Sequence, residues 1–321
     1  MTKDQRIIFW GSPEFAADIL HKLLKEKFNI VAVVTQPDKK IGRKQEISEP
    51  PVKSIALKNK INIFQPENLK EEEFIRQIKR LEPDLLLVAA YGKIIPKDIL
   101  DIPRRGSINV HASLLPKYRG ASPIQSAIIA GDEKTGVTLM LMDSGLDTGD
   151  IIAQKEIKIG KDETSETLTK KLSALGGELL VNSIGSWLEG GIKAIPQDSG
   201  QASYSKIIKR QDGEINWEEP ALEIYQKYKA YFPWPGLHTL LDVKGELKRI
   251  KLVDIYPLKS PGAGGKAGKI IKVEEKIAVQ TSEGLLAIRK AQIEGKREMA
   301  AEEIAKGYPE LIGSVFQNNF K

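Results

Sequence analysis

Short apolar runs alternate with helix-like segments through the first 190 residues of this chain. The runs Arg6–Trp10, Ile30–Thr35 and Asp84–Ala90 are rich in Ile, Val and Leu, as buried strands are. Between them, Pro13–Lys27 and Glu71–Leu81 repeat apolar residues at a spacing of three and four. Because parallel strands must be joined by long crossovers, usually helices, this order predicts an α/β fold with a parallel-rich sheet.

The composition changes near Gly190. Residues 190–206 are polar, rich in Gly and Ser and without periodicity, which predicts a linker. Beyond a predicted helix at Glu219–Ala230, several short strand-like runs separated by turns predict a small OB-like β-barrel. These runs are Leu237–Val243, Arg249–Tyr256, Lys269–Val273, Ile277–Thr281 and Leu285–Ile293. The predicted organisation is an α/β domain at 1–189, a linker at 190–206 and a barrel domain at 207–321.

Composition excludes several kinds of chemistry. Cysteine is absent, so the chain has no disulfide, no thiol nucleophile and no cysteine-based metal site. The three histidines are scattered at 21, 111 and 238, which disfavours a histidine metal centre. The first strand-to-helix turn, Gly11–Glu14, lacks the glycine spacing that lets a dinucleotide pyrophosphate approach a helix. We therefore expect chemistry without a metal and without a dinucleotide cofactor.

Hydropathy and charge indicate the cellular compartment of the protein and the kind of partner it can bind. No apolar run reaches membrane length and the first residues do not resemble a signal peptide, so we expect a cytoplasmic protein. Nothing in the sequence indicates self-association, and we expect a monomer. The net charge is +6, and residues 206–321 hold 20 Lys and Arg against 16 Asp and Glu. This excess is typical of a solvated Lys-rich surface and also permits a polyanionic partner.

Three polar side chains are placed where acyl-transfer chemistry needs them. Asn109 and His111 lie at the carboxyl end of the strand-like run Gly106–Val110, and strand alternation puts both on one face. Asp147 follows the strand-like run Gly136–Met142, in a Gly-rich loop. Groups at the carboxyl ends of strands converge on one crevice in an open α/β sheet. We expect the three to hold a carbonyl, stabilise its oxyanion and move a proton. The alternatives are a structural histidine and a turn aspartate.

Two further segments have both a functional and a structural interpretation. The apolar step Leu114-Leu115-Pro116 either packs onto the sheet or forms a wall for a flat ring, with Tyr91 and Gly92 as the opposite wall. Residues 36–52 form a long predicted loop with four basic residues around a glycine, Lys39, Lys40, Arg43 and Lys44. Such a loop is either solvated and mobile or binds phosphates.

Several stretches together resemble a known family. The segments INVHASLLPKYRGASPIQ (residues 108–125) and GVTLMLMDSGLDTGD (136–150) resemble the folate-dependent formyltransferases. Within that group, TQPDKKIGR (35–43) and the appended barrel resemble the methionyl-tRNA formyltransferases. The shorter stretches RIIFWGSPEFA, AYGKIIP, INW and FPWPG extend the resemblance nearly from end to end.

The resemblance implies a Rossmann-like formyltransferase domain followed by an OB-like, tRNA-binding C-terminal domain. It implies transfer of a formyl group from 10-formyltetrahydrofolate to the amino group of methionyl initiator tRNA, for translation initiation. Asn109, His111 and Asp147 would be catalytic, with a protonated His111 helping Asn109 to stabilise the oxyanion and Asp147 raising the His111 pKa. Folate-binding positions would be Ser113, Leu114, Leu115 and Pro116, and Arg43 would contact tRNA beside Lys39, Lys40 and Lys44.

Two other functions are compatible with parts of the sequence. A formyltransferase acting on a small amine, such as a nucleotide sugar or a purine precursor, would use the same three polar residues. The basic segment 36–52 and the barrel argue against it, because a small acceptor needs neither. A non-catalytic RNA-binding protein would have no use for Asn109, His111 and Asp147 together.

Overall fold

The structure is a computed structural model that describes residues 4–41, 45–259 and 265–318. The chain forms two compact units. The first comprises residues 1–124, 133–159 and 167–206, and the second comprises 125–132, 160–166 and 207–321. Among the described residues, no helix combines the length and apolar content that crossing a membrane requires.

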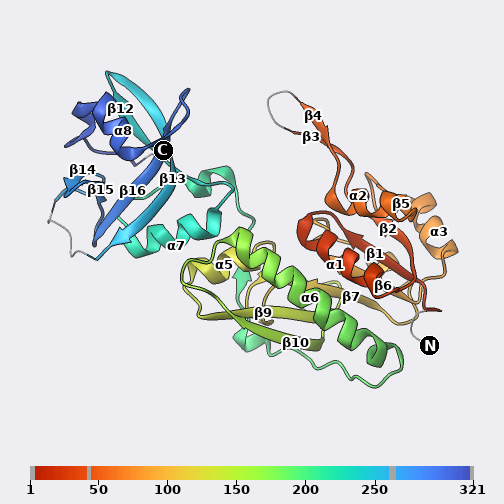
Figure 1. Cartoon of the computed structure of the whole chain (residues 1–321). Coiled ribbons are helices and arrows are strands. Elements are labelled where there is room, and N and C mark those ends of the chain that lie inside the picture. Colours follow the sequence, from red (N-terminus) through yellow and green to blue (C-terminus); the bar gives the residue numbers. More distant parts are fainter. Residues whose placement is uncertain (1–3, 42–44, 260–264, 319–321) are drawn as a thin grey trace. The chain divides into compact units, whose positions relative to one another are not determined.

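The first unit is built on a seven-stranded sheet in the order β10-β9-β7-β6-β1-β2-β5 (Figure 1). The strands are β1 (Ile7–Gly11), β2 (Ile30–Val34), β5 (Asn62–Phe64), β6 (Leu85–Ala89), β7 (Ser107–His111), β9 (Lys134–Leu141) and β10 (Ile151–Lys158). The five strands from β7 to β5 are parallel to one another. Strand β9 pairs antiparallel with β7, and β10 pairs antiparallel with β9. The predicted parallel-rich α/β sheet is confirmed.

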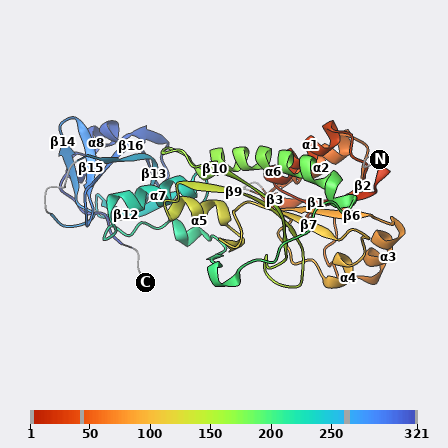
Figure 2. The same cartoon turned by 90° about the horizontal axis from the view of Figure 1, so that it is seen from below.

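Helices cover both faces of this sheet (Figure 2). They are α1 (Glu14–Lys25), α2 (Pro51–Lys58) and α6 (Ser165–Leu188) on one face, and α3 (Glu72–Arg80) and α4 (Lys97–Leu100) on the other. A further helix, α5 (Pro123–Ile129), connects β7 to β9. Alternation along β1 sends Ile8 and Trp10 to the face covered by α3, where they are fully buried with Phe74. Both faces of the parallel strands are therefore apolar, which explains their near-continuous apolar sequences.

Outside 42–44, the segment 36–52 contains more regular secondary structure than the predicted loop. They contain an antiparallel hairpin of β3 (Lys39–Ile41) and β4 (Glu46–Ser48), and α2 begins at Pro51. Figure 1 shows the hairpin projecting from the first unit. Strands of three residues are too short to show alternation in the sequence, and their charge resembles that of a loop.

Residues 190–206 belong to the first unit and are hydrogen-bonded to the rest of it at several points. Ile195 forms an isolated antiparallel bridge with Ile151. A short 3₁₀ turn at Ser199–Gln201 follows, and β11 (Tyr204–Ser205) then pairs in parallel with β8 (Arg119–Gly120). The segment has no periodicity because its hydrogen bonds go to scattered partners rather than to a regular ladder.

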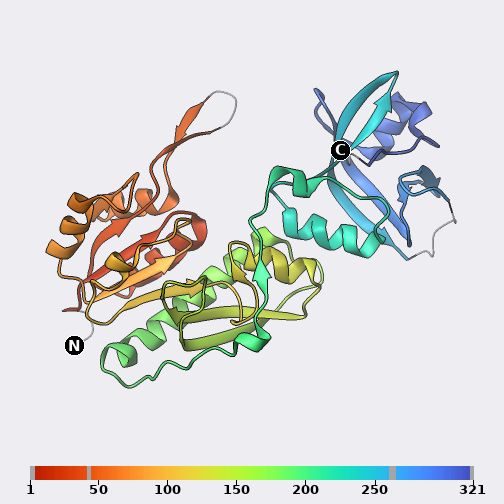
Figure 3. The same cartoon turned by 180° about the vertical axis from the view of Figure 1, so that it is seen from behind.

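The second unit contains a curled antiparallel sheet in the order β12-β13-β16-β15-β14, with β17 added to β16 (Figure 3). The strands are β12 (Leu237–Val243), β13 (Glu246–Leu258), β14 (Ile270–Val273), β15 (Lys276–Gln280), β16 (Leu285–Ile293) and β17 (Glu298–Ala300), with helices α7 (Ala221–Tyr231) and α8 (Ala301–Gly307). The two edges, β12 and the start of β14, are bridged through Leu240 with Gln317 and Lys269 with Val315. The predicted OB-like barrel is confirmed as this curled half-barrel.

Candidate active site

Asn109, His111 and Asp147 come together in the first unit. Asn109 and His111 lie two residues apart on β7, and both face Asp147 from the loop between β9 and β10. His111 Nδ1 lies 3.6 Å from Asp147 Oδ2. The Asn109 amide donates a long hydrogen bond of 3.5 Å to Asp147 Oδ1. His111 is buried, whereas Asn109 and Asp147 are half-buried, so the cluster reaches the surface through the amide and the carboxylate.

The sequence predicts that the three residues meet because each lies at the carboxyl end of a strand. This reason holds for Asn109 and His111 on β7, but it is wrong for Asp147. Strand β9 runs against β7, with Leu141 beside Ile108 and Thr138 beside His111. The carboxyl end of β9 therefore lies at the amino end of β7, and the loop must turn back to bring Asp147 to His111. Gly149 permits this return, because a Cβ there would lie only 1.8 Å from the Leu141 carbonyl oxygen.

The loop holds Asp147 in a backbone conformation that non-glycine residues rarely adopt. Its φ is +52°, in the left-handed region, which persists in proteins only where surrounding contacts fix it. The backbone N–H of Gly120 donates to Asp147 Oδ2 at 2.8 Å. The side chain of Gln197 donates to the Asp147 carbonyl oxygen at 2.9 Å. Contacts to both side chain and main chain therefore fix where the carboxylate lies.

His111 has one ring nitrogen committed and one directed at the carboxylate. Nε2 lies 3.0 Å from the Tyr118 carbonyl oxygen. A carbonyl can only accept, so Nε2 carries the proton and Nδ1 is the nitrogen that faces Asp147. Burial lowers the pKa of His111, and the Asp147 charge and the Tyr118 carbonyl offset only part of this. The site thus favours a neutral imidazole at neutral pH, in contrast to the protonated His111 expected from the sequence.

The segment Ser113–Pro116 is fixed by a network that the sequence does not reveal. The Thr138 hydroxyl donates to the Ser113 carbonyl oxygen at 2.7 Å and accepts from the Leu115 N–H at 3.0 Å. Ser113 and Leu115 are buried, whereas Leu114 and Pro116 are half-buried. Leu115 therefore packs inward, and the surface of the step is provided by Leu114 and Pro116. The only sequence signal of Thr138 is a hydroxyl within an apolar strand.

Tyr91 and Gly92 follow β6, the neighbour of β7. The Tyr91 ring is 3% exposed and packs edge-on against Trp10, with ring centroids 5.1 Å apart. Burial raises the pKa of Tyr91 to about 12. Exposed apolar surface is supplied instead by two residues that sequence reasoning missed, Ile94 (91% exposed) and Leu146 (56% exposed). Each lies in a loop that follows a strand of the sheet.

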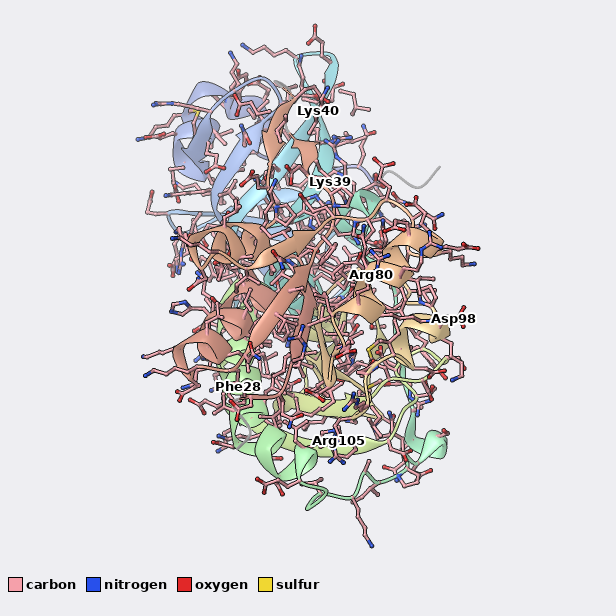
Figure 4. The ribbon with its side chains drawn as sticks, turned by 90° about the vertical axis from the view of Figure 1, so that its right-hand side faces the viewer. Phe28, Lys39, Lys40, Arg80, Asp98 and Arg105 are labelled. Atoms are coloured by element: carbon pink, nitrogen blue, oxygen red, sulfur yellow. The ribbon has the colours of Figure 1, made fainter. Side chains whose placement is uncertain are left out.

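The basic hairpin is braced at its base. Lys39 and Lys40 lie exposed on β3 (Figure 4), and Arg43 and Lys44 lie outside the described residues. Lys53 of α2 pairs with Asp38, which precedes β3, at 2.6 Å, and with Glu49, which follows β4, at 3.0 Å. These two hydrogen bonds hold the pKa of Lys53 above its usual value. Both legs of the hairpin are therefore tied to one helix.

Comparison with family models identifies both halves of the chain. Residues 5–184 match the family described as "Formyl transferase", and residues 207–309 match "Formyl transferase, C-terminal domain". A methionyl-tRNA formyltransferase of Caldicellulosiruptor saccharolyticus is 45% identical over 96% of this chain and 99% of its own length. One of Thermodesulfovibrio yellowstonii is 45% identical over 94% of this chain and 95% of its own length.

Solved structures with low sequence identity share the fold. A sugar 3N-formyl transferase, WlaRD, crystallised in the presence of dTDP and 5-N-formyl-THF, matches with a TM-score of 0.64 at 22% identity, over 91% of this chain and 99% of that one. HypX from Aquifex aeolicus matches with a TM-score of 0.65 at 15% identity over 96% of this chain. This chain spans half the length of HypX.

Proposed function

Because this chain belongs to the formyl transferase family, we propose that it transfers the formyl group of 10-formyltetrahydrofolate to the amino group of methionyl initiator tRNA. Relatives with that name match it over nearly its whole length. The observation that carries the chemistry is the meeting of Asn109, His111 and Asp147 around one point. An amide donor, a base and a carboxylate are the groups that formyl transfer to an amine requires.

The His111–Asp147 pair moves the proton. When the acceptor nitrogen bonds to the formyl carbon, it must lose a proton, and the bond from that carbon to the donor nitrogen must break. The neutral imidazole and the carboxylate lie 3.6 Å apart, and the Tyr118 carbonyl already occupies Nε2, so Nδ1 and the carboxylate form the accepting side. The pair takes the amine proton and returns it to the departing nitrogen. An imidazole whose pKa lies below its usual value releases such a proton readily.

Asn109 stabilises the charge that grows on the formyl oxygen. One hydrogen of its amide points to Asp147, which orients the group and leaves the second hydrogen for the substrate. A donor already in place costs no reorganisation during the reaction, and one such donor contributes about 3 kcal/mol of transition-state stabilisation. His111 adds to this once it has taken the proton, because its positive charge then lies beside the same oxygen.

The donor supplies the formyl group on a nitrogen that can leave. Its flat ring needs apolar walls and backbone groups at its edge. Leu114 and Pro116 on one loop and the exposed Ile94 and Leu146 on two others provide apolar surface on the loops around β6, β7 and β9. We assign Ser113 and Leu115 to the frame of this subsite, because both are buried and hydrogen-bonded to Thr138. Tyr91 and Gly92 contribute backbone to the opposite side.

The acceptor is bound through its phosphates. Lys39 and Lys40 are exposed on a hairpin that projects from the first unit, and Arg43 and Lys44 belong to the same segment of sequence. Residues 206–321 add a net positive charge, with 20 Lys and Arg against 16 Asp and Glu. Lysine and arginine neutralise phosphates with release of counterions, so binding of tRNA weakens as salt rises. A small amine would use neither surface.

The test is formylation of three acceptors by the full-length protein. Charged initiator tRNA, free methionine and an amino sugar nucleotide are each incubated with 10-formyltetrahydrofolate, and N-formyl product is quantified. We expect product with the tRNA at a rate well above that of either small amine. Equal or faster formylation of a small amine would overturn the proposal. Arg43→Ala, which removes one charge from the hairpin segment, is expected to raise the KM for tRNA and flatten its salt dependence.

A further inference from the structure

A glutamine in the segment 190–206 contacts the main chain of the proposed catalytic loop. The Gln197 amide nitrogen donates to the Asp147 carbonyl oxygen at 2.9 Å and to the Gly149 carbonyl oxygen at 2.7 Å. The two acceptors lie on either side of Thr148, in the loop that carries the Asp147 carboxylate. Gln197 comes from a part of the chain some 50 positions away and touches neither His111 nor Asn109 by any hydrogen bond among the described residues.

The other end of Gln197 is held by a buried cation. Arg119 Nε and Nη2 both donate to Gln197 Oε1, at 3.1 and 2.8 Å, and Arg119 is 2% exposed. This fixes which way the amide points. Arginine can only donate and carbonyls can only accept, so a reversed amide would turn its NH₂ toward Arg119 and its oxygen toward Asp147 and Gly149. Gln197 is therefore locked as a two-sided connector.

Gln197 binds the main chain of Asp147, a residue with an uncommon backbone conformation. Asp147 has a φ of +52°, a conformation that costs free energy in a non-glycine residue. The other polar contacts to Asp147 within the described part of the chain, from Gly120, Asn109 and His111, all reach its side chain. Gln197 binds its main chain. Without that bond the loop would relax toward a more common φ, and the carboxylate would move relative to His111.

We propose that Gln197 is a positioning residue for formyl transfer, which holds the Asp147 loop in its reactive conformation and is itself oriented by Arg119. The inference rests on the proposed function of this site. It assigns to the segment 190–206 a role in the chemistry rather than only in joining two units. The role is one of geometry, because Gln197 has no atom that titrates and donates only to backbone oxygens.

Two substitutions of Gln197 distinguish loss of its donor alone from loss of both its donor and its acceptor. Gln197→Glu keeps an acceptor for Arg119, and strengthens it by charge, but replaces the donor with an oxygen that faces two carbonyls. Gln197→Met removes both ends without adding charge. Gln201→Glu is the matched control, since Gln201 lies in the same segment, is exposed and bonds only to Asp198 among its described side-chain contacts.

We expect kcat to fall by about 100-fold in Gln197→Glu and in Gln197→Met, the size typical of a reacting group displaced by about 1 Å. The KM for charged tRNA should stay within about twofold, since the acceptor surfaces are untouched. In Gln197→Met the NMR titration of His111, one of only three histidines in the chain, should shift to lower pH as the Asp147 charge moves away. Gln201→Glu should match the wild type in all three measurements.

Three outcomes overturn the inference. One is a wild-type kcat in Gln197→Glu. A second is a lowered thermal midpoint with unchanged turnover per folded molecule and an unchanged His111 titration, which would make Gln197 merely structural. A third is an equal loss in Gln201→Glu. The failure of the proposed function has a different signature, because the wild type itself would then formylate charged tRNA no faster than a small amine.

Discussion

Replacing Asp147 by asparagine removes one charge and almost no volume. The amide oxygen of the new side chain can still accept from the Gly120 N–H, so the loop retains its strongest side-chain anchor. What is lost is a negative charge 3.6 Å from His111 Nδ1. At the effective dielectric of about 20 that suits such sites, a unit charge at that separation interacts with a protonated imidazole by roughly 4–5 kcal/mol. This is the stabilisation that the proton-carrying form of His111 loses.

A loss of about 4 kcal/mol in the transition state corresponds to a fall in turnover of about 1000-fold. The assay is single-turnover formylation of charged tRNA at saturating donor and acceptor, repeated across pH. Because the Asp147 charge offsets part of the effect of burial on His111, its removal lowers the His111 pKa further. The acid limb of the profile should therefore move to lower pH while the plateau falls.

The matched control is Asp143→Asn, in the same loop. Asp143 is exposed and accepts from the Gly145 N–H at 2.9 Å and the Thr148 hydroxyl at 2.7 Å, contacts that an asparagine oxygen can keep. It should retain nearly full activity. Turnover of Asp147→Asn within about threefold of the wild type would refute the charge argument, and an equal loss in Asp143→Asn would show that the loop as a whole was disturbed.

Three other outcomes follow from the same contacts. In steady-state kinetics, Asn109→Ala should lower kcat by about 10²–10³-fold and leave the KM for 10-formyltetrahydrofolate within about twofold. The reason is that the lost amide hydrogen bond acts on charge that develops in the transition state. A change confined to KM would contradict this. Lys53→Met should raise the Kd for tRNA, measured by filter binding, more than Lys58→Met does. The two changes remove equal charge from the same helix, but of the two lysines it is Lys53 that ties both legs of the hairpin. Equal effects on the Kd would exclude the brace. His111→Gln should flatten the pH dependence of stability. In the folded wild type the pKa of His111 lies below its usual value of 6.5, so the unfolded state binds the proton first as pH falls. The wild-type free energy of unfolding therefore declines below about pH 6.5. Urea unfolding of both proteins at about pH 7.5 and 5.5 measures this decline, and an equal change in the free energy of unfolding for both proteins would count against a lowered pKa.

The sequence predicts most of what depends on local burial. Strands β12 and β16 have the predicted bounds, and the predicted helix Pro13–Lys27 is observed as α1 (Glu14–Lys25). These elements have a strong apolar pattern, because one or both faces are buried. The same reasoning puts Asn109 and His111 on one face of β7, since strand alternation fixes that relation wherever the strand pairs.

Pattern cannot predict how the edge strands pair. The sequence of β9 is apolar on both faces, because both faces are buried. It therefore lacks the apolar–polar alternation that would have distinguished antiparallel from parallel pairing with β7. Asp147 does lie beside His111, as predicted, but the predicted reason is contradicted by the antiparallel register. The hairpin β3–β4 escapes prediction for a related reason, since three-residue strands without a buried face carry no period.

Gln197 shows why functional geometry is harder to predict than fold. The contacts of Gln197 run to a buried arginine and to two main-chain oxygens, and none of these leaves a pattern in residues 190–206. Asp147 has a left-handed backbone conformation, and its main-chain carbonyl oxygen accepts a hydrogen bond from Gln197, about 50 positions away in the sequence. This contact comes from a stretch whose composition is that of a linker. Where a site depends on a strained backbone, the polar segments without periodicity are the place to look for the groups that hold it.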